Sequence, residues 1–197
     1  MNKPNGYDEA KASGEYIPID LGGHYCEVKQ VSETQSSTGK SMIVVLFDFC
    51  PPDKQAGYFS KIFQEDDRSD KKWPFAGSKY IMVNDYNDPE KTSRQFKTFC
   101  TCIEKSNNYE IKWGGNDWAK QFKGKKIGTV YGEEENEYDG KTFMRPVPKW
   151  FCKSDAAPDQ RIPEPKYLSR NKPAATQPQG SDDFMNIPEG AGEEIPF

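Results

Sequence analysis

The chain has 197 residues, which suits one domain of ordinary size with an extension and argues against two large domains. Hydrophobic residues make up 34% and charged residues 29%, so a large buried enzyme core is not expected, whereas the 13% of aromatic residues must fill a small β core or form a contact surface. The net charge is −4, and no apolar run approaches the roughly 20 residues that a membrane-spanning helix needs.

Three strands are predicted in the first third of the chain. Residues 23–34 alternate apolar and polar side chains, and residues 41–50 form a nearly continuous β-branched and aromatic run, typical of a strand buried on both faces. Two prolines at 51 and 52 end this run. Residues 57–64, GYFSKIFQ, are the third strand, so the three form an antiparallel meander.

One helix is predicted over residues 89–106, after a charged loop at 65–72 and a stretch that stays unassigned. Asp88-Pro89-Glu90 is a helix-start signal, with a capping side chain, a proline at the first helical position and an acid in the first turn. Four apolar residues then recur at the spacing of one helix face: Phe96, Phe99, Cys100 and Ile103. Residues 116–122 add one further helical turn.

Two more strands complete the predicted domain, at 125–132 and 141–151. The acidic run between them, 133–139, is interpreted as a solvated loop that ends in the hairpin signal Asp139-Gly140. The element order β-β-β-α-β-β is the one an OB-fold requires, so we expect a mainly β, five-stranded OB-fold-like barrel with one inserted helix. A small open α+β sheet with the same order is the alternative.

The two ends of the chain differ in composition from this domain. Residues 152–197 contain seven of the 15 prolines but only three of the 26 aromatic residues, and they cannot bury enough apolar surface to offset the entropy of ordering. The sequence therefore predicts a flexible arm at 1–15, a folded domain at 16–151 and a disordered linker and tail at 152–197.

Charge is concentrated in the tail. Residues 174–197 carry five acids and no base, which leaves 27 bases and 26 acids, a net charge of +1, on the other 173 residues. A slightly basic body with an acidic tail is common among proteins that bind polyanions, although an acidic tail also serves as a solubilising segment.

Catalytic and metal chemistry find little support. The only histidine, His24, lies in a predicted strand without a recognisable triad. Cys100 and Cys102 would point about 200° apart on the predicted helix and cannot share an ion. The acidic run at 133–139 suits a solvated loop better than a Mg²⁺ site. No enzyme activity, cofactor or metal site is therefore predicted.

Basic and aromatic residues alternate in two predicted strands, the combination with which single-strand binders hold a backbone and stack bases. Strand 57–64 and strand 141–151 each place rings and cations on one face, and Trp73 adds a ring beside two lysines. The alternative is that these rings face the core and the cations lie at its rim. The predicted contacts to single-stranded DNA are Lys40, Phe59, Lys61, Phe63, Lys71, Lys72, Trp73, Phe143, Arg145 and Lys149.

The chain ends in two acids followed by Ile-Pro-Phe. The five residues are Glu193, Glu194, Ile195, Pro196 and Phe197. This ending resembles the acidic tip of bacterial and phage single-stranded DNA-binding proteins, in which the tip docks partner proteins: the terminal ring enters an apolar pocket and a basic rim holds the carboxylates. Gly192 stands where that family often has another acid.

The body carries a second resemblance. The segments STGKSM at 37–42, KWP at 72–74, KGKKIG at 123–128 and YGEEE at 131–135 are similar to those of small proteins encoded in prophages of Gram-positive bacteria, which are grouped with phage single-strand binders. Together the resemblances imply a protein that coats single-stranded DNA in phage replication or recombination and recruits replication or recombination proteins through its tip. Bacterial members of that family form tetramers, so the resemblance is also compatible with a homo-oligomer.

The expected compartment is the cytoplasm, because no apolar signal stretch is seen at residues 1–15 and the five scattered cysteines suit reduced thiols. Two rival functions remain: a non-enzymatic interaction or inhibitor module with a solubilising tail, and a nuclease that uses the acidic loop.

Overall fold

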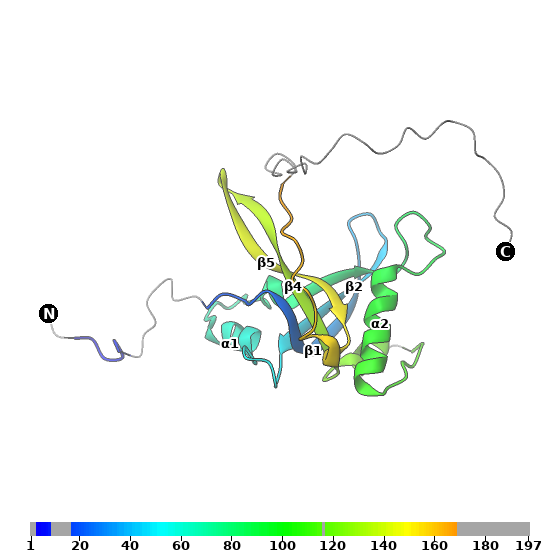
Figure 1. Cartoon of the computed structure of the whole chain (residues 1–197), viewed down its shortest axis with the longest axis horizontal. Coiled ribbons are helices and arrows are strands. Elements are labelled where there is room, and N and C mark those ends of the chain that lie inside the picture. Colours follow the sequence, from blue (N-terminus) through cyan, green and yellow to red (C-terminus); the bar gives the residue numbers. More distant parts are fainter. Residues whose placement is uncertain (1–2, 9–16, 116, 169–197) are drawn as a thin grey trace, which may run out of the picture.

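A five-stranded antiparallel sheet in the order β3-β2-β1-β4-β5 forms the centre of the computed structural model, which describes residues 3–8, 17–115 and 117–168 (Figure 1). The strands are β1 (Gly22–Gln35), β2 (Ser41–Phe49), β3 (Ser78–Met82), β4 (Lys126–Tyr138) and β5 (Lys141–Cys152). The helices are α1 (Tyr58–Glu65), α2 (Arg94–Asn107) and the 3₁₀ turns η1 (Phe75–Gly77), η2 (Trp118–Phe122) and η3 (Ser154–Ala156). The mainly β prediction is confirmed, and the sheet is open, with β3 and β5 at its edges.

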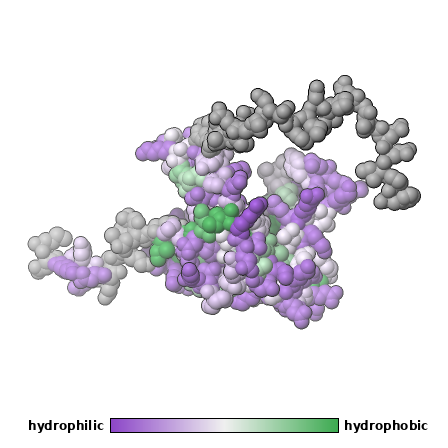
Figure 2. Space-filling model, viewed as in Figure 1, coloured by the Kyte–Doolittle hydropathy of each residue, from purple (hydrophilic) through white to green (hydrophobic). Residues whose placement is uncertain are grey.

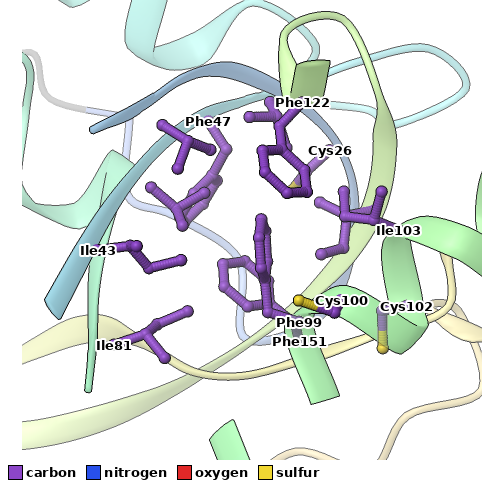
Figure 3. Close-up of a cluster of buried hydrophobic side chains, with 14 of the residues drawn as sticks. Cys26, Ile43, Phe47, Ile81, Phe99, Cys100, Cys102, Ile103, Phe122 and Phe151 are labelled. Atoms are coloured by element: carbon purple, nitrogen blue, oxygen red, sulfur yellow. The ribbon is translucent and has the colours of Figure 1, made fainter. Parts of the chain in front are cut away.

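The core lies between one face of this sheet and helix α2 (Figure 3). Phe151 of β5 packs edge-on against Phe47 of β2, with ring centroids 5.6 Å apart, and also contacts Phe99 of α2 at 5.5 Å. Ile43 and Ile81 add fully buried side chains from the two neighbouring strands. Helix α2 contacts both edge strands, β3 and β5, which do not pair with each other.

The predicted strand at 57–64 is wrong, because these residues form helix α1. The buried carboxylate of Asp48, on β2, accepts hydrogen bonds from the backbone N–H groups of Phe59 (2.9 Å) and Ser60 (3.1 Å), which are unpaired donors of the first helical turn. Gly57, at a φ of 78°, turns the chain into the helix. The apolar residues of this segment fit the periodicity of a helix as well as that of a strand. The hydrogen bonds from Asp48, which is distant in the sequence, favour the helix.

Helix α2 begins at Arg94, five residues later than predicted. Ser93 caps it, and its hydroxyl accepts a hydrogen bond from the N–H of Phe96 at 3.1 Å. The expected start at Asp88 instead forms a turn in which Lys91 N donates to the Asp88 carbonyl at 3.0 Å. Strand β3, in the stretch left unassigned, pairs with β2 through contacts such as Tyr80 with Val44.

The acidic run at 133–139 is not a loop, since β4 continues to Tyr138 and pairs with β5 along its length. Asp139 and Gly140, with φ values of 50° and 71°, form the two-residue turn that their sequence predicts. The resulting β4–β5 hairpin projects from the body of the fold (Figure 1).

The ordered chain also extends beyond the predicted boundary at residue 151. Ala157 is fully buried, and its carbonyl lies so close to Gly23 that a Cβ there would be 1.8 Å from it. Lys166 then pairs beside β4: its N–H donates to the Glu133 carbonyl at 3.0 Å, and its carbonyl accepts from Glu135 N at 2.8 Å. The segment following β5 is therefore part of the domain up to Leu168.

All five cysteines are free thiols, and burial raises the pKa of Cys100 and Cys152 to about 12. Among the residues that the structure describes, no helix combines the length and apolarity needed to cross a membrane.

Candidate nucleic-acid interface

Three exposed rings follow one another along strand β3 and its two flanks. Phe75 lies in η1 before the strand, Tyr80 lies in the strand and Tyr86 lies in the loop after it; their exposed fractions are 56%, 52% and 77%. Tyr80 points away from the core because its neighbour Ile81 is fully buried and successive strand residues face opposite sides. We call Phe75, Tyr80 and Tyr86 the ring track.

The outer face of the sheet beside the track is apolar. The cross-strand pairs Val44 with Tyr80 and Met42 with Met82 place these side chains on the face opposite the core. Val44, Met42 and Met82 are half-buried. Most of the face seen in Figure 2 is hydrophilic, so the outward-facing apolar pair of strands is a candidate contact surface.

A cation lies over the first and the last ring of the track. The Lys40 ammonium is 3.9 Å from the centroid of the Tyr86 ring, and it also donates a hydrogen bond to the Tyr86 carbonyl at 3.1 Å. The Arg145 guanidinium carbon is 4.9 Å from the centroid of Phe75. In the described part of the chain neither cation has a carboxylate within 4.0 Å, so both keep charge for an anionic ligand.

A cavity of about 580 Å³ adjoins the outer face, and Met42 lines both. Its wall includes Trp113, which is 64% exposed and stacks on Trp118 with ring centroids 5.8 Å apart and an interplanar angle of 25°. A flat, exposed indole beside open space is suited to stacking on a planar ligand. Trp113 was not among the predicted contacts.

Part of the predicted contact set belongs to the core or its support. Phe59 is fully buried. Phe63 and Trp73 pack on each other at 5.6 Å, and the Trp73 indole N–H donates to the Gly77 carbonyl at 2.9 Å, which fixes η1. The Lys71 ammonium lies 5.0 Å from the centroid of the same Phe63 ring. The Trp73 hydrogen bond thus supports η1, the turn that also contains Phe75.

The remaining predicted residues differ in exposure and pairing. Lys61, on α1, and Lys72, in the segment before η1, are exposed. Phe143 is 47% exposed on the β4–β5 hairpin, two residues from Arg145. Lys149 forms hydrogen bonds within the protein: its ammonium donates to the Glu134 carboxylate at 2.9 Å and to the Glu133 carbonyl at 3.1 Å. Of the ten, Lys40 and Arg145 lie over rings of the track, and Phe143 lies on the same strand as Arg145.

The three track rings were missed because strand β3 was missed. Its sequence, SKYIM between Gly77 and Val83, does alternate outward and inward residues, and this is the signal that could have found Tyr80. The five predicted docking residues of the tip, at 193–197, lie outside the described residues.

No family model and no curated protein matches this sequence. The geometry of the ring track and the sequence resemblances are therefore the grounds on which a function is inferred.

Proposed function

We propose that this protein binds single-stranded DNA along the ring track and the outer face of β2 and β3, without catalysing a reaction on it. The observation that carries the proposal is the run of three rings, each more than half exposed, along β3 and its two flanks, with a cation at each end that forms no ion pair with the described residues. Bases stack on such rings whatever their sequence, and cations beside them neutralise phosphates. The proposed role is to coat exposed strands in phage replication or recombination.

The strand order supports a finer fold assignment. The order β3-β2-β1-β4-β5, with a helix between β3 and β4 in the sequence, is that of an OB-fold barrel opened between β3 and β5. One hydrogen bond crosses that seam, from the Lys79 ammonium to the Pro148 carbonyl at 2.8 Å. We infer that the sheet is an OB-fold barrel whose seam is filled by side chains and α2.

This assignment predicts the same binding surface independently. OB-folds bind oligonucleotides on the face of their second and third strands, between the loop joining strands one and two and the loop joining strands four and five. Here those strands carry Val44 and Tyr80, the first loop ends at Lys40, and the second is the tip of the β4–β5 hairpin. The acidic tip at 193–197 is proposed to recruit replication or recombination proteins to the coated strand.

A matched pair of variants tests the surface. Tyr80→Ala removes the central ring of the track, whereas Tyr167→Ala removes a ring that is 39% exposed on the segment after β5. We expect Tyr80→Ala to weaken binding of a fluorescent oligo-dT by about 1–3 kcal/mol, the usual loss for one stacking ring, and Tyr167→Ala to leave it unchanged. Equal affinities for wild type and Tyr80→Ala, with both folded by circular dichroism, would move the binding surface elsewhere.

A further inference from the structure

A small cavity of about 140 Å³ lies at the seam between β3, α2 and β5. Three cations line it, one from each element: Lys79, Arg94 and Lys149. Gln95, Thr98 and Trp150 contribute polar atoms and a ring, and no aspartate or glutamate is among its lining residues in the described chain. A cavity with three cations and no acid in its wall is suited to an anion.

Among the residues that the structure describes, only Lys149 of these three cations forms an ion pair. Lys149 pairs with Glu134 at 2.9 Å, and the same carboxylate has Lys166 at 3.9 Å on its other side. Burial tends to raise the pKa of Glu134, but the hydrogen bond from Lys149 and the positive charges of Lys149, Lys166 and Arg145 together lower it below its ordinary value. Glu134 is therefore ionised and already shared between two lysines.

Lys79 is the unusual cation. Its ammonium has three donors, and the structure gives it one acceptor, the Pro148 carbonyl at 2.8 Å. No carboxylate in the described residues lies within 4.0 Å of it. Its pKa is lowered to about 8, chiefly by burial and in smaller part by the charge of Lys149, while Glu134 acts in the opposite direction. A desolvated ammonium is costly unless it meets a partner, and the cavity is where a partner would sit.

Arg94 adds a second cation without a partner. It is the first residue of α2, it is exposed, and it forms no ion pair in the part of the chain that the structure describes. The first turn of α2 contains no acid, so the partial positive charge of this 14-residue helix is also uncompensated there. Lys79 and Arg94 together leave two positive charges for a ligand.

We propose that this cavity binds a phosphate monoester, the terminal phosphate of a nucleic-acid strand. A terminal phosphate carries about −1.5 to −2 charges at pH 7, which matches the two uncompensated cations, whereas an internal phosphodiester carries one. The cavity lies beside the strand that carries Tyr80: Lys79 is the neighbour of Tyr80 on β3, although the two side chains face opposite sides of that strand, and Lys149 lies on the same strand as Arg145. The inference thus rests on the proposed function for the source of the phosphate, but not for the anion site itself.

Two measurements test the anion site and the nucleic-acid source of its phosphate separately. In the first, wild-type protein, Lys79→Met and the control Lys61→Met are titrated with oligo-dT carrying a 5′-phosphate, a 3′-phosphate or neither. We expect one phosphorylated end to bind wild type and Lys61→Met roughly tenfold more tightly than the unphosphorylated oligomer. Lys79→Met should bind all three alike. Equal affinity of wild type for the three oligomers would overturn the terminal-phosphate assignment.

In the second measurement, the titration of Lys79 is followed by NMR of its side chain with and without inorganic phosphate. We expect phosphate to move the titration midpoint upward, because the anion favours the charged ammonium. An upward shift without any oligo-dT binding would support the anion site while refuting the proposed DNA function. A midpoint unaffected by phosphate, together with equal oligomer affinities, would refute the site.

Discussion

The guanidinium carbon of Arg145, on β5, lies 4.9 Å from the centroid of the Phe75 ring in the turn before β3. The contact joins the β4–β5 hairpin to the start of the ring track, and so places a permanent cation beside a ring that is 56% exposed. The Nε atom of Arg145 is buried without a hydrogen-bond partner among the described residues, which leaves the guanidinium poorly satisfied by the protein alone.

Replacing this cation tests whether it contacts phosphate. Arg145→Gln should weaken binding to oligo-dT and oligo-dC by a similar factor, because a phosphate contact is independent of sequence, and should reduce the slope of log affinity against log salt by about 1. Fluorescence anisotropy at several salt concentrations measures both quantities. Arg68→Gln is the control, since Arg68 lies in the loop after α1 and its charge is already paired with Asp66 at 2.7 Å. An unchanged salt slope for Arg145→Gln would contradict the assignment.

The capping of helix α1 by Asp48 predicts that a change at this residue lowers the stability of the protein. Asp48 is 1% exposed and its two oxygens accept from Phe49, Phe59 and Ser60. Asp48→Asn replaces one acceptor oxygen by a donor that faces another N–H, so we expect the free energy of unfolding to fall by about 1–3 kcal/mol in urea. Asp67→Asn, at an exposed position, should change it by less than about 0.5 kcal/mol. Equal midpoints for both variants would show that the cap does not hold the helix.

The lowered pKa of Lys79 predicts that the stability of the fold rises with pH. Its pKa in the folded protein is about 8, below its ordinary value of 10.5, so the folded state binds this proton more weakly than the unfolded state. Below pH 8 the charge therefore destabilises the fold, and stability recovers as pH rises from 8 to 10.5. Lys79→Met should be more stable than wild type at pH 7 by about 3 kcal/mol, and this advantage should vanish near pH 10.5. A difference that stays constant with pH would contradict the desolvation of Lys79.

The C-terminal tip gives a prediction about partners. Deleting Phe197 should leave oligo-dT affinity unchanged and abolish capture of replication or recombination proteins from host lysate, because the terminal ring and its carboxylate are the proposed anchor. Adding one residue after Phe197 should have nearly the same effect, since it moves the carboxylate away from the ring. The measurement is a pull-down with the unaltered chain and the two variants. Identical partner proteins from all three would reduce the tail to a solubilising segment.

The elements that the sequence predicted are those set by local pattern. Strand β2 follows from its continuous run of β-branched and aromatic residues, and the buried face of α2 follows from the spacing of Phe96, Phe99 and Ile103. The turn at Asp139 and Gly140 follows because both residues tolerate a positive φ.

The misses arise from contacts made at a distance along the chain. Tyr58, Phe59, Ile62 and Phe63 can form a helix face or alternate along a strand, and Asp48, eleven residues before Phe59, decides between them. Strand β3 has five residues and gains its conformation by pairing with β2. The rings of the track could not be assigned until that pairing placed Ile81 inside and Tyr80 outside.

The central claim is binding to single strands, and a salt series of oligo-dT titrations tests it most directly. Fluorescein-labelled dT oligomer and a duplex of the same length are titrated with the full chain from low to physiological salt. We predict saturable binding to the single strand, a linear fall of log affinity with log salt, and weaker binding to the duplex at every salt concentration. Failure of the folded protein to bind oligo-dT even at low salt, or tighter binding to the duplex, would contradict the account.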